Sequence, residues 1–244
     1  MDGARTELLI GAIARMLEGC RTVAIGASSP IPGAAALLAR ARSGGRMRVL
    51  MLGSRKHNAF TDGGRELFDC AAQGRIDAFF LGGGQIDGAA NINLVGTGEA
   101  PRWTQRFPGS FGSAYLYFLI PRVILFREEH TPRVLVPKVD FISSPGTSAP
   151  EVYRPGGPHA LVTGRCVFDF DKATRRFRLA SVHEGETPAG IRRETGFDYD
   201  ETDSIPQTAP LGVADLELLR GRVTGEIAET YPRFAAALFG RQAA

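Results

Sequence analysis

The chain has 244 residues, of which 43% are hydrophobic and 23% are charged, and its formal net charge is +3. This composition supplies enough apolar material for a sizeable core and excludes a disordered or fibrous protein. The basic residues lack the interleaved aromatics of a nucleic-acid platform, so we expect no nucleic-acid partner. No run of about eighteen apolar residues occurs, so we expect no membrane-spanning helix.

Cysteine and histidine spacing argues against metal sites and disulfides. The cysteines, Cys20, Cys70 and Cys166, are odd in number and far apart, so the sequence predicts neither a disulfide framework nor a CxxC metal site. The histidines are not at ligand spacing either, and we expect no metal. The sequence begins without the apolar segment of an export signal. These features favour the reducing cytoplasm.

The first third of the chain alternates between helical and strand patterns. Apolar residues recur at helical spacing over residues 6–18, and Ala-rich and amphipathic patterns predict helices over 34–42 and 63–73. Short apolar runs predict strands over 21–26, 47–52 and 76–81. Such alternation predicts parallel strands with helices across their faces, because a parallel connection needs a crossover.

The second half is richer in short β patterns separated by turn-forming residues. We expect strands over residues 122–127, 133–136, 139–143, 160–163, 166–169 and 176–182. Mixed or antiparallel pairing is expected there. Helices follow over 188–194 and 213–238, the latter interrupted at Tyr231-Pro232 because proline opposes a helical conformation in the preceding residue. We therefore expect a single α/β domain over residues 1–244, with an open, mixed, largely parallel sheet, a β-rich second half and a helical C-terminal end.

A glycine-rich polar segment follows the predicted strand 76–81. Ligands in open α/β sheets gather beyond the carboxyl ends of strands, so this position is favourable for a site. The candidate site-shaping residues are Gly83, Gly84, Gln85, Asp87, Asn91 and Asn93. Consecutive glycines let the backbone approach a bulky group, and the short polar side chains can fix the loop by local hydrogen bonds. The structural alternative is a rigid turn without a ligand.

Two further loops carry small polar residues. Gly109, Ser110, Phe111 and Gly112 form a loop that can aim successive backbone N–H groups into one cavity, as the developing oxyanion of a thioester requires. A plain strand-to-helix turn is the alternative. Ser144 lies in a Ser-Ser-Pro-Gly turn that either borders the same site or is an ordinary loop.

The order of these segments resembles the β subunits of family I CoA-transferases, of which glutaconate CoA-transferase is one. The likeness runs through residues 80–93, 107–112 and 138–146, and then through 167–170 and 195–198. It implies an open α/β fold, an α-subunit partner in a heteromer, and an active site at the subunit interface that accepts an acyl-CoA. Coenzyme A is then part of the substrate, and no cofactor is held permanently. The loop 109–112 matches the family's glycine-rich loop.

The chain departs from this family at the position of the catalytic nucleophile. The family's nucleophilic glutamate ends the strand that corresponds to residues 47–52, and Met51 stands in its place, whereas Gly53 keeps the turn. A thioether cannot carry an acyl or CoA group through reversible exchange. The nearest downstream carboxylates, Asp62 and Glu66, are expected to serve the start and the surface of a helix.

A related branch of the superfamily also lacks this glutamate. That branch hydrolyses a carbon–carbon bond in a ring-bearing CoA thioester during steroid degradation, with the essential carboxylate in the α subunit, and this sequence is similar to it. The resemblance thus favours hydrolysis of a carbon–carbon bond or a thioester over CoA transfer. Two alternatives stay open: a true CoA-transferase whose nucleophile lies elsewhere, and a non-catalytic scaffold that stabilises an active α subunit.

Overall fold

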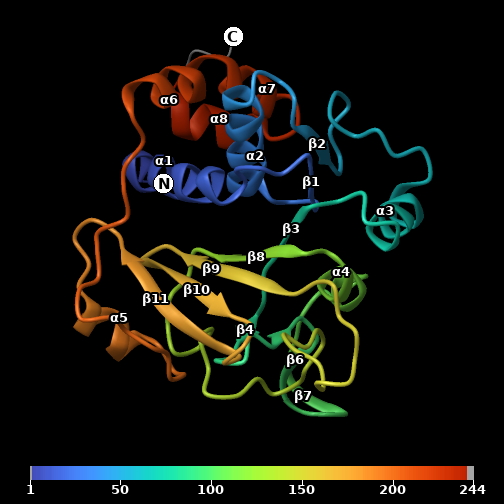
Figure 1. Ribbon diagram of the computed structural model, residues 1–244, viewed down its shortest axis with the longest axis vertical. Helices are drawn as coiled ribbons and strands as arrows, with labels where there is room; N and C mark the ends of the chain where they lie inside the picture. The colour runs from blue at the N-terminus through green and yellow to red at the C-terminus, as the bar shows by residue number, and fades with distance from the viewer. Residues whose placement is uncertain (1, 241–244) are drawn as a thin grey trace. The chain divides into compact units, whose positions relative to one another are not determined.

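The computed structural model describes residues 2–240 and divides them into two compact units (Figure 1). Unit 1 contains the residues up to Phe80 and those from Ala209 onward. Unit 2 is the continuous segment Leu81–Thr208. The chain therefore leaves the first unit once and returns to it.

Unit 1 is built on parallel strands in the order β3-β1-β2. Ile25, at the end of β1, is in register with Met51, at the end of β2. The strands are β1 (Thr22–Ile25), β2 (Arg48–Met51) and β3 (Ala78–Leu81), and the connecting helices are α1 (Gly3–Met16), α2 (Pro30–Arg42) and α3 (Gly63–Ala72). The predicted alternation of the first third is confirmed, with α2 starting earlier than expected because Pro30 suits the first helical turn.

Local sequence explains the two helices that pack together in this unit. The Asp2 carboxylate accepts from Ala4 N at 3.1 Å, which satisfies one of the unpaired donors at the start of α1. Leu9 and Ile13 recur at i,i+4 spacing and are fully buried. In α2 every residue from 31 to 39 is buried, so this small-residue helix is covered on all sides.

Helices from the end of the described chain complete unit 1. They are α6 (Val213–Leu218), a π-helical turn η1 (Leu219–Val223), α7 (Thr224–Ala228) and α8 (Pro232–Phe239). Figure 1 shows these orange-to-red helices beside the blue α1 and α2, which they contact. Arg42 Nε and Nη2 each donate a hydrogen bond of 2.7 Å to one carboxylate oxygen of Asp215. The predicted interruption before Pro232 is confirmed, because α7 ends at Ala228 and α8 begins at the proline.

Unit 2 contains the mixed pairing expected of the second half. Strands β8 (Arg122–Arg127) and β9 (Pro158–Thr163) are parallel, whereas β9, β10 (Cys166–Asp171) and β11 (Arg176–Val182) are antiparallel. The short helix α5 (Pro188–Glu194) follows β11, and its first turn is capped by Thr187 Oγ1, which accepts from Gly190 N at 3.1 Å. Four aromatic rings pack together at 4.9–6.5 Å between centroids and form much of the core: Phe168, Phe177, Phe197 and Tyr199.

A buried polar network lies beside this aromatic core. His130 is 4% exposed, and its Nδ1 and Nε2 lie 2.8 Å from Thr163 Oγ1 and 3.0 Å from Thr195 Oγ1. Burial lowers the pKa of His130 to about 4, with a smaller contribution from the Arg165 charge. Burial likewise raises the pKa of the neighbouring Cys166 thiol to about 12. Both groups are therefore neutral at pH 7.

Two strand predictions were wrong. Residues 133–136 and 139–143 form no strands. Isolated bridges join Leu135 to Ile86 and Ser144, just after the second segment, to Ile92. Pro137 and Pro145 lack the N–H that a continuous ladder needs, so the backbone pairs only locally. Small elements lie between β3 and β8: the pairs β4 (Gln85–Ile86) with β5 (Ile92–Asn93) and β6 (Gly96–Glu99) with β7 (Arg102–Arg106), and the helix α4 (Ser113–Leu119).

The observed architecture agrees with the expected class. Mostly parallel strands carry helices between them in unit 1, the second half is rich in β structure, and the described chain ends in helices. Across residues 2–240, none of the helices combines the length and the hydropathy that crossing a bilayer requires.

Candidate functional site

The turn after β2 lies at the carboxyl end of a parallel strand, where open α/β folds place their ligands. Met51, the last residue of β2, is fully buried. A Cβ added to Gly33 of α2 would lie 3.0 Å from the Met51 methyl and 3.1 Å from Ile227 Cδ1 of α7, so the thioether packs among these helices. Gly53 turns the chain in the left-handed region at φ 89°. The side chain at position 51 thus belongs to the core of unit 1.

Ser54 organises this turn through its hydroxyl. Its Oγ donates to Glu229 Oε2 at 2.7 Å and accepts from His57 N at 2.9 Å. Glu229 Oε1 accepts from Arg55 N at 2.8 Å. These donors, led by the Ser54 hydroxyl, hold the pKa of Glu229 below its usual value. An ionised carboxylate from the end of α7 therefore sits on the turn that follows Met51.

A second carboxylate lies near the same turn. His57 Nε2 is 3.2 Å from Glu226 Oε2, although the two atoms are not aligned as a hydrogen bond. Arg222 Nε donates to Glu226 Oε1 at 2.7 Å, and Arg40 lies 3.6 Å from the other oxygen. Two guanidinium groups thus neutralise Glu226.

The proximity of Ser54, Glu226 and Glu229 was not predicted from the sequence. Ser54 and Glu229 are separated by 175 positions, and no local pattern signals their pairing. The carboxylates that were considered lie elsewhere: Glu66 Oε2 accepts from Thr61 N at 2.6 Å, and Asp62 pairs with Arg65 at 3.2 Å. Both residues serve the start of α3, as expected.

In unit 2 the polar side chains of the segment 82–93 bond to their own loop and to residues 138–146. Gln85 Oε1 accepts from Asn93 Nδ2 at 2.7 Å and from Asp140 N at 3.0 Å. Asn93 is fully buried, and Gln85 is 6% exposed. These amides bond to one another, which is the behaviour of a rigid structural turn.

The carboxylate of this segment has the same role. Asp87 Oδ1 accepts from Asn91 N at 3.0 Å, and Asp87 Oδ2 accepts from Asn91 Nδ2 at 3.1 Å. Asn91 Oδ1 in turn accepts from Gly146 N at 3.1 Å. This pair therefore joins the segment to the Pro145 turn.

The glycines of the segment permit close packing inside the protein. A Cβ on Gly84 would lie 2.3 Å from Phe107 Cε2, and one on Gly83 would lie 2.6 Å from Gln85 O. Neither glycine has a positive φ. The absence of a side chain at Gly84 lets the Phe107 ring pack against the backbone, and this contact positions the next loop.

The loop 107–112 has an unusual backbone that leaves N–H groups available. Gly109 has φ 113°, and Phe111 has φ 46° with 79% of its surface exposed. Gly109 N donates to Leu94 O at 3.2 Å, so it is already used. The N–H groups of Ser110 and Gly112 have no acceptor within residues 2–240. These two donors remain for a bound group.

Ser144 fixes the start of α4, immediately after this loop. Its Oγ lies 2.7 Å from Ser113 Oγ, and both side chains are buried. The Tyr117 hydroxyl on the same helix donates to Ala90 O at 3.0 Å. The three glycine-rich loops of the sequence analysis are thus brought together within unit 2 and interlocked by hydrogen bonds.

Comparison with known proteins finds relatives of this chain. The profile of the coenzyme A transferase family matches residues 3–193. The B-type subunit of glutaconate CoA-transferase from Acidaminococcus fermentans is 30% identical over 151 residues, which cover 59% of this chain and 56% of that protein. The cholesterol ring-cleaving hydrolase IpdB subunit of Mycobacterium bovis is 28% identical over 165 residues, which cover 63% and 62%. The matched parts are thus less than two thirds of each relative.

A solved structure extends the likeness over more of the chain. The crystal structure of Rhodococcus jostii RHA1 IpdAB aligns with a TM-score of 0.78 and 25% identity. The alignment covers 91% of this chain and 94% of that one. The fold is therefore shared nearly throughout.

Proposed function

The chain belongs to the coenzyme A transferase family, and from this premise we propose that it is the β-type subunit of a heteromeric enzyme acting on acyl-CoA thioesters. Relatives with different activities carry the names of B-type subunits, which supports an α-subunit partner. Coenzyme A would enter as part of the substrate, with no permanently bound cofactor.

The observation that carries the choice of reaction is the complete burial of Met51 between α2 and α7. A buried thioether at the family's nucleophile position can neither attack a thioester nor exchange CoA. We therefore favour hydrolysis of a carbon–carbon bond or a thioester in a ring-bearing acyl-CoA. The catalytic carboxylate would come from the α subunit.

The part assigned to this chain is stabilisation of developing negative charge. Ser110 and Gly112 offer N–H groups beside the left-handed Phe111, and such preorganised donors stabilise an oxyanion more than the ground-state carbonyl. The hydrogen bonds of Ser144 to Ser113 and of Gly109 to Leu94 hold the loop in place. The segment 82–93 would support the loop rather than touch the substrate.

Exposed apolar side chains on unit 2 offer a surface for the α subunit. Phe111 is 79% exposed, Tyr153 is 86% exposed, and Phe141 and Ile142 are 40% and 48% exposed. Phe111 and Ile142 each lie two positions from a serine of the hydrogen-bonded pair Ser113 and Ser144. Large exposed apolar side chains are typical of interaction surfaces.

One observation favours a second candidate, CoA transfer. Glu229 presents an ionised carboxylate at the turn after Met51, where a nucleophile from another part of the chain would be needed. Against this, both of its oxygens accept hydrogen bonds from the protein, which lowers their nucleophilicity.

The deciding experiment combines co-expression with product analysis. The chain is purified with its α subunit and incubated with ring-bearing acyl-CoA thioesters, with and without an acceptor acid, and products are followed by mass spectrometry. Acceptor-independent addition of water supports the hydrolase. Acceptor-dependent formation of a new acyl-CoA that is lost in Glu229→Gln supports the transferase.

The oxyanion role is tested by a matched pair at one position. Ser110→Pro removes the backbone N–H, whereas Ser110→Ala keeps it. We expect kcat to fall by about a hundredfold in the proline variant and to change little in the alanine variant. Equal activity in both variants of the assembled enzyme would exclude Ser110 as the donor.

A further inference from the structure

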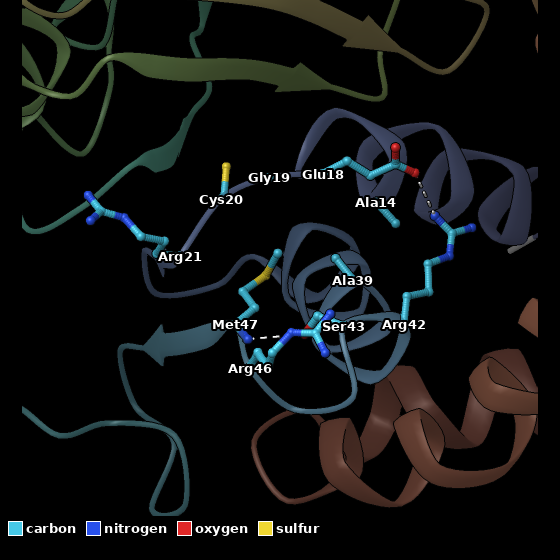
Figure 2. A pocket seen from close by; sticks show the side chains of 10 residues that line it. All are labelled: Ala14, Glu18, Gly19, Cys20, Arg21, Ala39, Arg42, Ser43, Arg46 and Met47. Atoms are coloured by element: carbon cyan, nitrogen blue, oxygen red, sulfur yellow. Dashed lines mark hydrogen bonds and ion pairs between the residues drawn. The ribbon is translucent and has the colours of Figure 1, made fainter.

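A cavity of about 570 Å³ lies in unit 1 at the amino ends of β1 and β2 (Figure 2). The residues that follow α1 and α2 border it, including Cys20 before β1 and Met47 before β2. The turn after β2 is at the opposite end of the same strands. The cavity is therefore separate from the position of the family nucleophile.

The cavity has an excess of positive charge. Arg21, Arg42 and Arg46 are among the residues that line it, and Glu18 is the one carboxylate among the described lining residues. Arg21 points away from the other lining side chains in Figure 2 and pairs with Asp77 at 3.5 Å. Arg42 is neutralised by Asp215 at 2.7 Å and lies 3.9 Å from Glu18, as the dashed line in Figure 2 marks. Arg46 is exposed, and its side chain has no hydrogen-bond or ion-pair partner within residues 2–240. Arg46 is thus the cation that remains for a ligand.

The inner wall of the cavity is apolar. Ala14, Ala39 and Met47 are at most 4% exposed and lie in the middle of the view in Figure 2. The volume falls in the range of about 300–1,000 Å³ that small-molecule sites occupy. Apolar walls with a few cations at the rim suit a ligand that has an apolar body and one anionic group.

Arg46 is not needed to satisfy the end of α2. The carbonyl of Arg40 accepts from Ser43 Oγ at 2.8 Å and from Gly45 N at 2.9 Å. Ser43 Oγ also accepts from Met47 N at 3.0 Å. The last turn of α2 is therefore capped without the Arg46 side chain.

From this geometry we propose that the cavity binds a small organic anion. The carboxylate or phosphate of the ligand pairs with Arg46, because a guanidinium group forks onto either group through two parallel hydrogen bonds. Its apolar body lies on Ala14, Ala39 and Met47. The Cys20 thiol, at the edge of the cavity, is covered when the ligand is bound.

The rate at which a maleimide modifies Cys20 reports whether the cavity is occupied. The full chain is treated with a neutral maleimide, and the modification rates of individual cysteines are measured by mass spectrometry at constant ionic strength in the presence of hexanoate, hexyl phosphate or hexanol. Cys70 is a matched control, because it is also half-buried and does not line the cavity. At ten times its Kd, a bound anion leaves about one site in eleven empty, so Cys20 reacts about tenfold more slowly.

Arginine variants separate the site from general charge. We expect Arg46→Glu to abolish the protection of Cys20 and Arg48→Glu to retain it, because Arg48 is also exposed but lies outside the cavity lining. A ligand-induced rise in Tm should follow the same pattern, which provides a second measurement if Cys20 reacts slowly. Hexanoate and hexyl phosphate distinguish a carboxylate site from a phosphate site. Equal protection of Cys20 by hexanol would overturn the proposal. So would the absence of both Cys20 protection and a rise in Tm with either anion at 10 mM, which is about the millimolar limit of useful affinity.

Discussion

The Ser54 hydroxyl donates a 2.7 Å hydrogen bond to Glu229 Oε2 and thereby joins the turn after β2 to the end of α7. The same carboxylate accepts from Arg55 N, so one side chain holds two consecutive residues of the turn. The position of the C-terminal helices in unit 1 depends in part on this contact.

Replacing Glu229 should therefore loosen the turn and remove an acid-sensitive contribution to stability. We expect Glu229→Gln to lower the free energy of unfolding by about 1 kcal/mol at pH 7, because a hydrogen bond to a charged group is exchanged for a neutral one at a partly exposed site. Since the native pKa is lowered, the contribution is present above the unfolded pKa and is lost as the pH falls through the folded value. Urea titrations at pH 7 and pH 3 measure the effect. An unchanged difference between variant and parent at the two pH values would contradict it.

His130 should make the protein acid-sensitive over a different window. Its native pKa of about 4 lies below the ordinary value of 6.5, so the unfolded chain binds more protons between these values. The contribution of His130 to the free energy of unfolding is therefore fully present above pH 6.5. It falls by up to about 3 kcal/mol as the pH drops toward 4. His130→Gln should be less stable at pH 7 but should lose less on acidification to pH 4.5, as measured by urea unfolding. If the free energy of unfolding of parent and variant fell equally between pH 7 and pH 4.5, another group would be responsible for the acid sensitivity.

Met51→Glu should destabilise unit 1 rather than restore a nucleophile. The new carboxyl group would be buried against Gly33 and Ile227, at a cost of about 3 kcal/mol. Met51→Leu is the control, because it conserves volume and should cost less than about 1.5 kcal/mol. Thermal unfolding separates the two variants. A stable glutamate variant that gained CoA transfer would mean that position 51 reaches the substrate.

Gly84→Ala should displace Phe107 from the backbone of the segment 82–93. The added methyl would lie 2.3 Å from the ring, and such overpacking costs about 1–3 kcal/mol. Gly212→Ala is a matched control, because nothing lies within 4 Å of its added Cβ and its φ is −72°. The double variant Gly84→Ala with Phe107→Ala should recover part of the loss if the ring is the obstacle. Chemical denaturation of Gly84→Ala, Phe107→Ala and the double variant measures this coupling.

Local patterns predicted much of the fold but little of the long-range pairing. The helices and strands of the first third have clear periodicities, and the break at Pro232 follows from proline chemistry. Residues 133–143 were misassigned because apolar residues such as Val134 and Val139 are buried without belonging to a ladder. Periodicity reports burial, whereas pairing depends on a partner that the segment itself does not specify.

The same contrast between local patterns and long-range contacts holds for the candidate site. The sequence predicted that short polar side chains fix the segment 82–93 by local hydrogen bonds, and Asn93 and Gln85 do so. It did not reveal that the N–H of Gly109 is occupied while those of Ser110 and Gly112 are available. It also did not indicate that the Met51 side chain is buried in the core of unit 1, because its burial depends on helices distant in sequence that cover the strand.

The division of the chain into a continuous and a discontinuous unit bears on how the protein is made. Unit 2 is a single stretch, Leu81–Thr208, and has all its own residues once that stretch has left the ribosome. Unit 1 must wait for α6 to α8, so β1, β2 and their helices emerge long before the segment that covers Met51 and binds the Ser54 turn. During synthesis the apolar side chains of α2 have no complete core to enter, and this early stage is when the nascent chain needs chaperone protection most.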